Sequence, residues 1–370
     1  MKSLIWICLF VATLLSGCTF SGISHLEYDS YQPTIESFDV KQVLHLQESQ
    51  DYDIFDYQDN VVLILVSDRS KQNPIDINDQ VNTTYYERFV LFDLSLKEIK
   101  EDLPLQKFGI CRSALSSFDG VVFSFFEVTP DHTLTSSIQF ISSYGIRCIY
   151  NGNFSAFGMG PILQHYDNAI LFSYLERENN AFGVMKITNT IEVEPILYFS
   201  TEEFDYISDD FKASKNSYGY AIGDAGKVTF CVGTSAGLTN QISLPEGKRI
   251  HGFDVTDEML IVSLAADKTD LDGLAGILIF NLATGEPILE NVDSADPLYS
   301  ISVNEHNQMC GFCKSTLQLY TLQDRIEEIP ADTSTVSGGF FKILSNGSNF
   351  LVATYGYNKR PEFWVVSLNG

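Results

Sequence analysis

Asp59-Asn60-Val61-Val62-Leu63-Ile64-Leu65-Val66 is the stretch that decides the fold, because a polar turn runs directly into a hydrophobic strand. Clear further copies are Asp119-Gly120 before Val121-Val122-Phe123-Ser124-Phe125-Phe126, and Asp167-Asn168 before Ala169-Ile170-Leu171-Phe172-Ser173-Tyr174. Runs rich in β-branched and aromatic residues, bounded by Asp, Asn, Gly and Ser turns, are typical of β-strands. Since we find no long helical period from about Phe38 onward, the sequence predicts an all-β protein.

This pattern of a polar turn followed by a hydrophobic strand recurs at the spacing of a four-stranded propeller blade. The weaker copies begin near Asn216, Asp257, Asn307 and Asn346. Successive copies lie 60, 48, 49, 41, 50 and 39 residues apart, and one blade takes about 40 to 50 residues. The sequence therefore predicts a single β-propeller over residues 37–370. Seven blades are favoured, with six or eight left open.

Blades of this kind must form a ring, because a lone four-stranded sheet cannot bury both of its faces. We expect Ser37–Leu46 to close the ring by adding a strand to the blade that contains Glu362–Leu368. The competing architecture is two β-sandwich domains with a boundary between Thr201 and Asp210. No Pro-, Ser- or Gly-rich linker interrupts the chain, which favours one domain.

Residues 1–17 have the features of a secretory signal peptide. Lys2 supplies a positive charge, and the apolar run Leu4–Leu15 is too short to span a bilayer comfortably. The following Leu15-Ser16-Gly17-Cys18 resembles the lipobox of bacterial lipoproteins. This resemblance implies that the signal is cleaved and that Cys18 carries the lipid. Residues 18–36 are then expected to be a lipidated tether.

A lipobox followed by irregular acidic repeats resembles the six- or seven-bladed β-propeller lipoproteins of bacteria. The segment Ile279–Glu286 is similar to the Asp-x-x-Thr-Gly turn of quinoprotein-type blades. Gly158-Met159-Gly160-Pro161 resembles a Gly-x-Gly-Pro turn of the six-bladed lipoproteins. The resemblance implies a protein held at the cell envelope by its lipid, on the outer membrane if the bacterium is Gram-negative.

The charge balance restricts the partners of this chain. It has 48 acidic and 23 basic residues, which gives a net charge of −25. Such a field repels nucleic-acid phosphates and anionic lipid headgroups and attracts cations and basic proteins. We therefore expect no nucleic-acid binding, membrane contact through the lipid anchor only, a basic or cationic partner, and a monomer.

One acidic loop is a candidate metal site. Asp267, Asp270 and Asp272 lie together just before Gly273, an oxygen-rich arrangement of the kind that binds Ca²⁺. The position at which an EF-hand carries its bidentate Glu holds Ile279, so a solvated loop is the competing interpretation. The same competing interpretation covers Glu202–Asp205. No other cofactor is expected.

Two motifs favour structural over catalytic interpretations. Gly233-Thr234-Ser235-Ala236-Gly237 fits the Gly-x-Ser-x-Gly pattern of hydrolases, but 238–245 reads as a strand rather than the required helix, so we expect a hairpin loop. Cys310-Gly311-Phe312-Cys313 has the spacing of a redox or zinc pair. Residues i and i+3 of a strand face opposite sides, so we expect buried strand cysteines there.

These observations favour a binding protein over an enzyme, and no catalytic residue is assigned. We expect a lipid-anchored envelope scaffold that presents loops and a central funnel to an envelope protein or an extracellular ligand. One alternative is a hydrolase or lyase whose site lies at the axial mouth, where residues from distant blades converge. The other is a carbohydrate-binding lipoprotein, because exposed aromatic faces stack on sugars.

Overall fold

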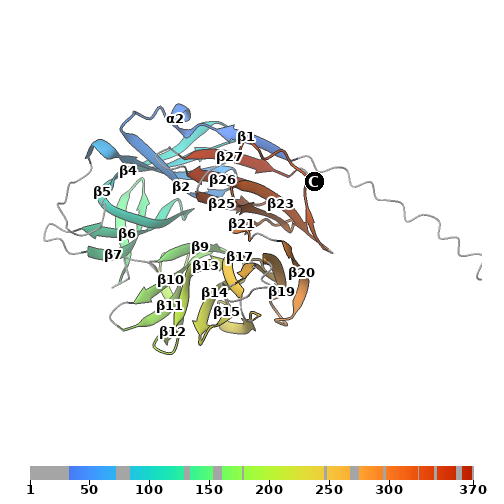
Figure 1. Cartoon of the computed structure of the whole chain (residues 1–370). Helices are drawn as coiled ribbons and strands as arrows, with labels where there is room; N and C mark the ends of the chain where they lie inside the picture. The colour runs from blue at the N-terminus through green and yellow to red at the C-terminus, as the bar shows by residue number, and fades with distance from the viewer. Residues whose placement is uncertain are drawn as a thin grey trace, which may run out of the picture.

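The computed structural model describes residues 33–71, 84–128, 134–152, 161–176, 179–245, 248–266, 275–294, 297–323, 325–336, 340–355 and 361–368. Over these ranges the chain is almost entirely β-strand. The strands form radial sheets around one axis, and strands such as β9 (Ile162–Tyr166), β13 (Tyr206–Ala213), β17 (Lys248–Val255) and β21 (Tyr299–Val303) lie nearest the centre of the ring (Figure 1). None of the helices within the described ranges is long and apolar enough to cross a membrane.

The first three blades contain β2 to β12, paired antiparallel throughout. Blade 1 consists of β2 (Gln50–Gln58), β3 (Val61–Asp68), β4 (Thr84–Asp93) and the first half of β5 (Glu98–Ser117). Blade 2 consists of the second half of β5, β6 (Gly120–Val128), β7 (Leu134–Ser142) and β8 (Gly145–Gly152). Blade 3 consists of β9 (Ile162–Tyr166), β10 (Ala169–Glu176), β11 (Ala181–Ile187) and β12 (Val193–Ser200).

The remaining four blades complete the ring. Blade 4 consists of β13 (Tyr206–Ala213), β14 (Tyr218–Asp224), β15 (Lys227–Thr234) and β16 (Gly237–Ser243). Blade 5 consists of β17 (Lys248–Val255), β18 (Met259–Ala266), β19 (Ala275–Asn281) and β20 (Pro287–Ser294). Blade 6 consists of β21 (Tyr299–Val303), β22 (Gln308–Cys313), β23 (Thr316–Leu322) and β24 (Ile326–Glu328). Blade 7 consists of β25 (Phe340–Asn346), β26 (Asn349–Tyr355), β27 (Glu362–Ser367) and β1 (Thr34–Phe38).

The hydrophobic core lies between the blades. Seven clusters of buried residues are found among the described residues, one at each interface between neighbouring blades. At the interface of blades 1 and 2, for example, the rings of Phe89 and Phe123 lie 5.1 Å apart. Each strand therefore alternates its side chains between two apolar neighbours, which explains the nearly continuous hydrophobic runs in the sequence.

The predicted ring closure is confirmed, but its strand lies earlier than expected. β1 pairs with β27 from Thr34 opposite Ser367 to Phe38 opposite Phe363, and Figure 1 shows these two strands side by side. The expected strand, 37–46, was placed too late. Asp39 ends β1 and caps the helical turn α2 (Val40–Val43), accepting a hydrogen bond from the Gln42 amide at 3.0 Å.

The polar residues that begin the seven sequence repeats, from Asp59 to Asn346, all lie at the turns between the first and second strands of the blades. Asp59 and Asn60 have φ values of 47° and 62°, the left-handed pair that a tight hairpin turn of this kind requires. The predicted seven-bladed propeller is thus confirmed. The two-sandwich alternative is wrong, because its boundary region contains β13, which is flanked by buried clusters shared with both neighbouring blades.

Two connections between strands also shape the ring. The long strand β5 belongs to both blade 1 and blade 2, and Gly109 at its midpoint is opposite Thr84 of β4 and Glu127 of β6. A Cβ atom at Gly109 would collide with the carbonyl oxygen of Phe126, so this close approach requires glycine. A short 3₁₀ turn, Arg69–Lys71, follows β3.

Candidate functional site

The first strands of all seven blades surround an axial cavity of about 410 Å³. Its lining comes from β2, β5, β9, β13, β17, β21 and β25, so the sequence brings together residues almost 300 positions apart. Its acidic and basic side chains are Asp56, Arg112, His165, Asp210, Lys212, Asp254 and Lys342. This is the described cavity in which residues of every blade converge, and it is the candidate functional site.

Asp56 on β2 joins three blades. Its Oδ2 accepts hydrogen bonds from the amide and the hydroxyl of Ser116 on β5, at 2.9 and 2.7 Å. The same oxygen lies 2.9 Å from Nε2 of His165 on β9, and since a carboxylate only accepts, Nε2 carries the proton. Its Oδ1 accepts from the Tyr57 amide at 2.9 Å. The carboxylate is therefore a clasp between blades 1, 2 and 3.

The surroundings of Asp56 favour its charged form. Burial is the largest influence and by itself raises the pKa, because it removes water from the charge. The charge and hydrogen bond of His165 and the two hydrogen bonds from Ser116 together outweigh it, so the pKa of Asp56 lies below its usual value. Asp56, only 5% exposed, is held as a buried carboxylate with every contact satisfied.

Asp254 on β17 makes the same kind of clasp between blades 5 and 6. Its Oδ1 accepts from the Val255 amide at 2.9 Å, and its Oδ2 accepts from the Val303 amide of β21 at 2.7 Å. Here burial raises the pKa of the carboxyl group and prevails over the opposing effects of Lys212 and the hydrogen bonds. The two buried carboxyl groups of the cavity therefore have pKa values shifted in opposite directions.

The basic residues of the cavity come from blades 2, 4 and 7. Lys342 on β25 donates from Nζ to the carbonyl oxygen of Ile54 at 2.5 Å and lies 4.5 Å from the centre of the Phe55 ring. These contacts tie blade 7 to blade 1 through a main-chain oxygen and an aromatic face. Arg112 on β5 is exposed to the cavity, and Lys212 on β13 is half-buried.

A second hollow, of about 520 Å³, adjoins the axial cavity on the side where the first strands end. Asp257 on its wall accepts hydrogen bonds from the Ser214 hydroxyl at 2.7 Å and from the Asn216 amide at 2.8 Å. These bonds lower the pKa of Asp257 despite the opposing effect of its burial, which is the largest single influence. They join blade 4 to blade 5, so this wall too is a structural contact.

No three His, Cys, Asp or Glu side chains of the described ranges are grouped so that they could hold a metal ion. The predicted Ca²⁺ ligands Asp267, Asp270 and Asp272 lie between β18 and β19, outside the described residues. Cys18 also lies outside them. Both assignments therefore remain predictions.

The Gly-x-Ser-x-Gly motif lies at a hairpin turn, as the sequence predicted. Of the two cysteines that were expected to be buried on a strand, Cys310 is buried, whereas Cys313 is only half-buried. Ser235 and Ala236 form the two-residue turn between β15 and β16, where Thr234 is opposite Gly237. Cys310 and Cys313 are both on β22, but Cys310 packs towards blade 7 and Cys313 towards blade 5. Neither motif contributes to the axial cavity.

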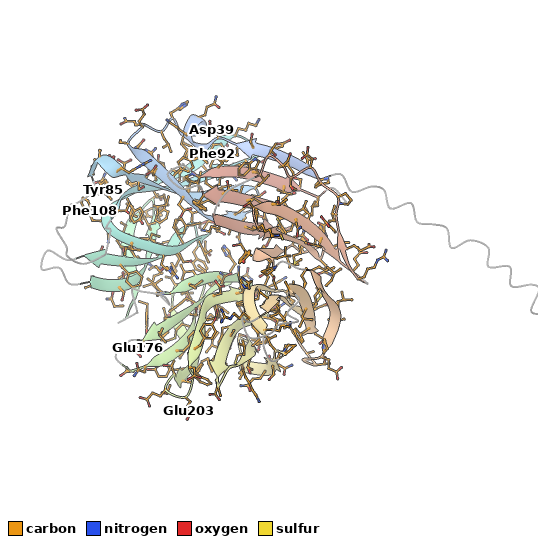
Figure 2. The ribbon with its side chains drawn as sticks, viewed as in Figure 1. Asp39, Tyr85, Phe92, Phe108, Glu176 and Glu203 are labelled. Carbon is orange, nitrogen blue, oxygen red and sulfur yellow. The ribbon has the colours of Figure 1, made fainter. Side chains whose placement is uncertain are left out.

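The other sequence motifs lie on the outside of blades or beyond the described residues. Asn281 in the quinoprotein-like segment forms the turn from β19 to β20, accepting bonds from the amides of Ala283 and Thr284. Glu203 points outward at the rim of the ring (Figure 2). Residues 158–160 of the Gly-x-Gly-Pro segment are outside the described residues.

The axial residues were missed at the sequence level, although a signal exists. Phe55-Asp56-Tyr57-Gln58-Asp59 and Phe253-Asp254-Val255-Thr256-Asp257 share a Phe-Asp-x-x-Asp pattern directly before the first turn of a blade. The first Asp of each is the buried clasp. His165, Lys212 and Lys342 carry no comparable pattern, because they meet only through ring closure.

Comparison with known proteins supports the architecture alone. No known protein family and no curated protein matches this sequence. The WD40 domain of Toxoplasma gondii coronin is 8% identical, with a TM-score of 0.53 over 92% of this chain and 87% of that chain. An oligogalacturonate lyase in complex with manganese is 11% identical, with a TM-score of 0.50 over 91% of this chain and 97% of that chain.

BamB from Moraxella catarrhalis is 13% identical, with a TM-score of 0.45 over 87% of this chain and 99% of that chain. The coronin WD40 domain and the oligogalacturonate lyase are β-propellers, which agrees with the propeller fold of this chain. Similarity at such identities reports a shared fold and carries no activity with it. The function of this chain has to be argued from its own residues.

Proposed function

We propose that this protein is a lipid-anchored binding protein of the bacterial cell envelope. Its propeller presents its outer loops and axial cavity to a protein partner or an extracellular ligand. The observation that carries the proposal is the use of the buried axial carboxylates. In both Asp56 and Asp254, the two carboxylate oxygens accept hydrogen bonds from main-chain amides of two neighbouring blades. They hold a rigid frame together, as a binding platform requires.

The membrane part of the proposal rests on the sequence. Acyl chains contribute roughly 0.8 kcal/mol of membrane affinity per buried CH₂ group, so a multiply acylated Cys18 would hold the ring at a membrane surface. Since the chain carries a net charge of −25, the strongly acidic ring would be repelled by anionic headgroups. The lipid would then be the sole attachment, and the surfaces of the blades would stay accessible to partners.

The membrane test replaces the lipidated residue. In cells fed a radioactive fatty acid, the native chain should become labelled and sediment with the membranes. The Cys18→Ser variant should remain unlabelled and move to the soluble fraction, while Cys148→Ser, which alters a cysteine of the propeller, should behave like the native chain. Equal labelling of the native and Cys18→Ser chains would refute the anchor.

The binding test is affinity capture of the lipidated protein from its own envelope after brief cross-linking. We expect one protein or ligand to return reproducibly and to be released by raised salt, because the acidic surface favours a basic partner. Capture that returns no reproducible partner at any salt concentration would contradict the binding function.

The second candidate function is a hydrolase or lyase acting in the axial cavity. The observation that favours it is the pair of carboxyl groups with opposite pKa shifts, Asp56 and Asp254, since such pairs supply acid and base roles in enzymes. A screen of hydrolase and lyase substrates tests it. Turnover that is abolished by Asp56→Asn but not by Glu203→Gln would establish the enzyme and displace the scaffold.

A further inference from the structure

We propose that a groove between blades 1 and 2 binds a basic, partly apolar segment of the partner protein. This inference rests on the proposed binding function and assigns it a surface. The groove, of about 380 Å³, lies between the outer strand of blade 1 and the β7–β8 hairpin of blade 2. Its lining residues are Glu101, Asp102, Leu103, Pro104, Ile141, Ser142, Ser143, Gly145 and Ile146.

The apolar wall of this groove continues the buried interface of blades 1 and 2. Leu103 of β5 and Ile141 of β7 belong to the same hydrophobic cluster and are 3% and 1% exposed. Ile146 of β8, at the outer end of the groove, is 39% exposed. The cluster itself is covered, but Ile146, which is opposite Ile141 in the β7–β8 pairing, leaves exposed apolar surface beside it. An apolar side chain placed on Ile146 would extend the cluster.

Glu101 supplies the charge at the edge of this apolar wall. It is opposite Leu91 in the β4–β5 pairing, and Leu91 and Leu103 both pack in the cluster between blades 1 and 2, so Glu101 faces blade 2. Its Oε2 is buried and has no hydrogen-bond partner among the described residues. A buried carboxylate oxygen without a donor is costly, so the site is suited to a donor from outside.

The neighbouring cation of blade 1 is directed elsewhere. Arg88 lies opposite Pro104, and its Nε is 3.7 Å from Oδ2 of Asp102. Asp102 and Glu101 are consecutive in β5, so their side chains leave the strand on opposite faces. The ion pair therefore leaves the Glu101 side of the groove acidic. A lysine or arginine of the occupant fits there, with its aliphatic stem against Ile146.

The hairpin beside the groove offers an aromatic anchor. Ser142 is opposite Gly145, so Ser143 and Tyr144 form a two-residue turn, and the Tyr144 side chain is 99% exposed. Gly145 adopts a φ of +123°, a conformation that side chains with a Cβ rarely adopt. Tyrosine is one of the residue types enriched among binding hot spots.

A partner protein fits this groove better than a second copy of this chain does. Two copies, each with a net charge of −25, repel one another, and the groove carries an unpaired acidic oxygen of its own. A basic segment is attracted by both features. The chemistry of the occupant is thus a lysine or arginine flanked by aliphatic side chains.

The experiment titrates the folded chain lacking residues 1–17 with a fluorescein-labelled octapeptide that holds two arginines among valines and leucines. A second octapeptide with glutamates replacing the arginines is the control ligand. We expect the arginine peptide to bind and Glu101→Gln to weaken its binding about tenfold or more, as loss of a hydrogen bond to a charged group does. Ile146→Ser should weaken it about fivefold through lost apolar contact.

Glu98→Gln is the matched control, since it removes the same charge from an exposed position of the same strand. It should leave the affinity within about twofold, because exposed charges contribute little. Equal weakening by Glu98→Gln and Glu101→Gln, equal binding of both peptides, or no binding of the arginine peptide would overturn the groove. Self-association that Glu101→Gln abolishes would identify a second copy as the occupant and would also overturn it.

The result is separable from the proposed function. If the arginine peptide does not bind but a partner is captured from the envelope, the proposed groove site is refuted and the proposed binding function stands. A successful titration with failed capture supports the groove chemistry and refutes the proposed function.

Discussion

Asp56 and Asp254 occupy corresponding places in blades 1 and 5, yet their surroundings shift their pKa values in opposite directions. Both carboxylates accept from the next main-chain amide and from an amide of the following blade. Asp56 has the additional partner His165 at 2.9 Å, whereas the cation near Asp254, Lys212, acts on it through its charge. The nearby hydrogen-bonded imidazole decides which carboxylate is stabilised as an anion.

We predict that Asp56→Asn lowers the free energy of unfolding by about 3 kcal/mol at pH 7, as removing one partner of a buried pair does. Asp254→Asn should lower the free energy of unfolding by less than Asp56→Asn does, because the carboxylate of Asp254 is less well stabilised. Urea titration followed by the fluorescence of Trp364, which is 5% exposed, measures both. A larger loss for Asp254→Asn than for Asp56→Asn would contradict this ranking.

The same pair predicts opposite pH dependences. The pKa of Asp56 is below that of an unfolded aspartate, about 3.9, so its stabilisation is present above that pH and is lost on acidification. The pKa of Asp254 is raised, so its ionisation weakens the fold as the pH rises from about 4.

Urea titrations at a series of pH values test this contrast. The native chain should exceed Asp56→Asn in free energy of unfolding by less and less as the pH falls below about 4. It should exceed Asp254→Asn by less and less as the pH rises above about 4. Parallel pH profiles for the two variants would show that His165 does not distinguish the two carboxylates.

At the scale of elements, β1 is the strand that makes the ring a closed structure. It supplies the outer strand of blade 7 although it comes first in the chain, and Phe38 at its end lies 5.3 Å from Phe92 of blade 1. Without it, β27 would expose a free edge, and the cluster between blades 7 and 1 would lose a covering side chain.

We predict that a chain beginning at Asp39 melts about 5–15 °C below one beginning at Pro33, since each lost kcal/mol lowers the melting temperature by roughly 2–4 °C in domains of 150–250 residues. The chain beginning at Pro33 is the control because it keeps β1 intact. Calorimetry measures both. Equal melting temperatures would mean that β1 does not close the ring.

Local pattern was sufficient to predict most of the architecture, because every blade has a polar turn between its first strand and a mostly buried second strand. The closing strand was placed late because Val40 and Val43 look strand-like, whereas the Asp39 cap turns them into a helix. The Phe-Asp-x-x-Asp pattern could have indicated Asp56 and Asp254, but the contact of Asp56 with His165 could not be predicted, since the two residues are 109 positions apart and meet only when the blades close. The groove depends on Glu101 facing blade 2, which a bulge in β5 helps to set.

At the scale of the whole molecule, the ring has structural clasps at its axis and a partly apolar groove at its rim. The clasps of Asp56, Asp254 and Asp257 each join neighbouring blades, so the frame is stiff. The exposed apolar surface of Ile146 lies in the same groove as Glu101. A rigid body with an acidic, partly apolar rim fits the proposed role of a platform for a basic partner at the envelope.

The most direct test of that role is photo-cross-linking in intact cells. A photoreactive benzoylphenylalanine is placed in turn at Tyr144, at Tyr198 on the outer strand of blade 3, and at the other large exposed hydrophobic positions. We predict a defined cross-linked protein from position 144 that disappears when Glu101→Lys is added, and none from position 198. A chain that yields no cross-linked protein from any of these positions would contradict the binding platform.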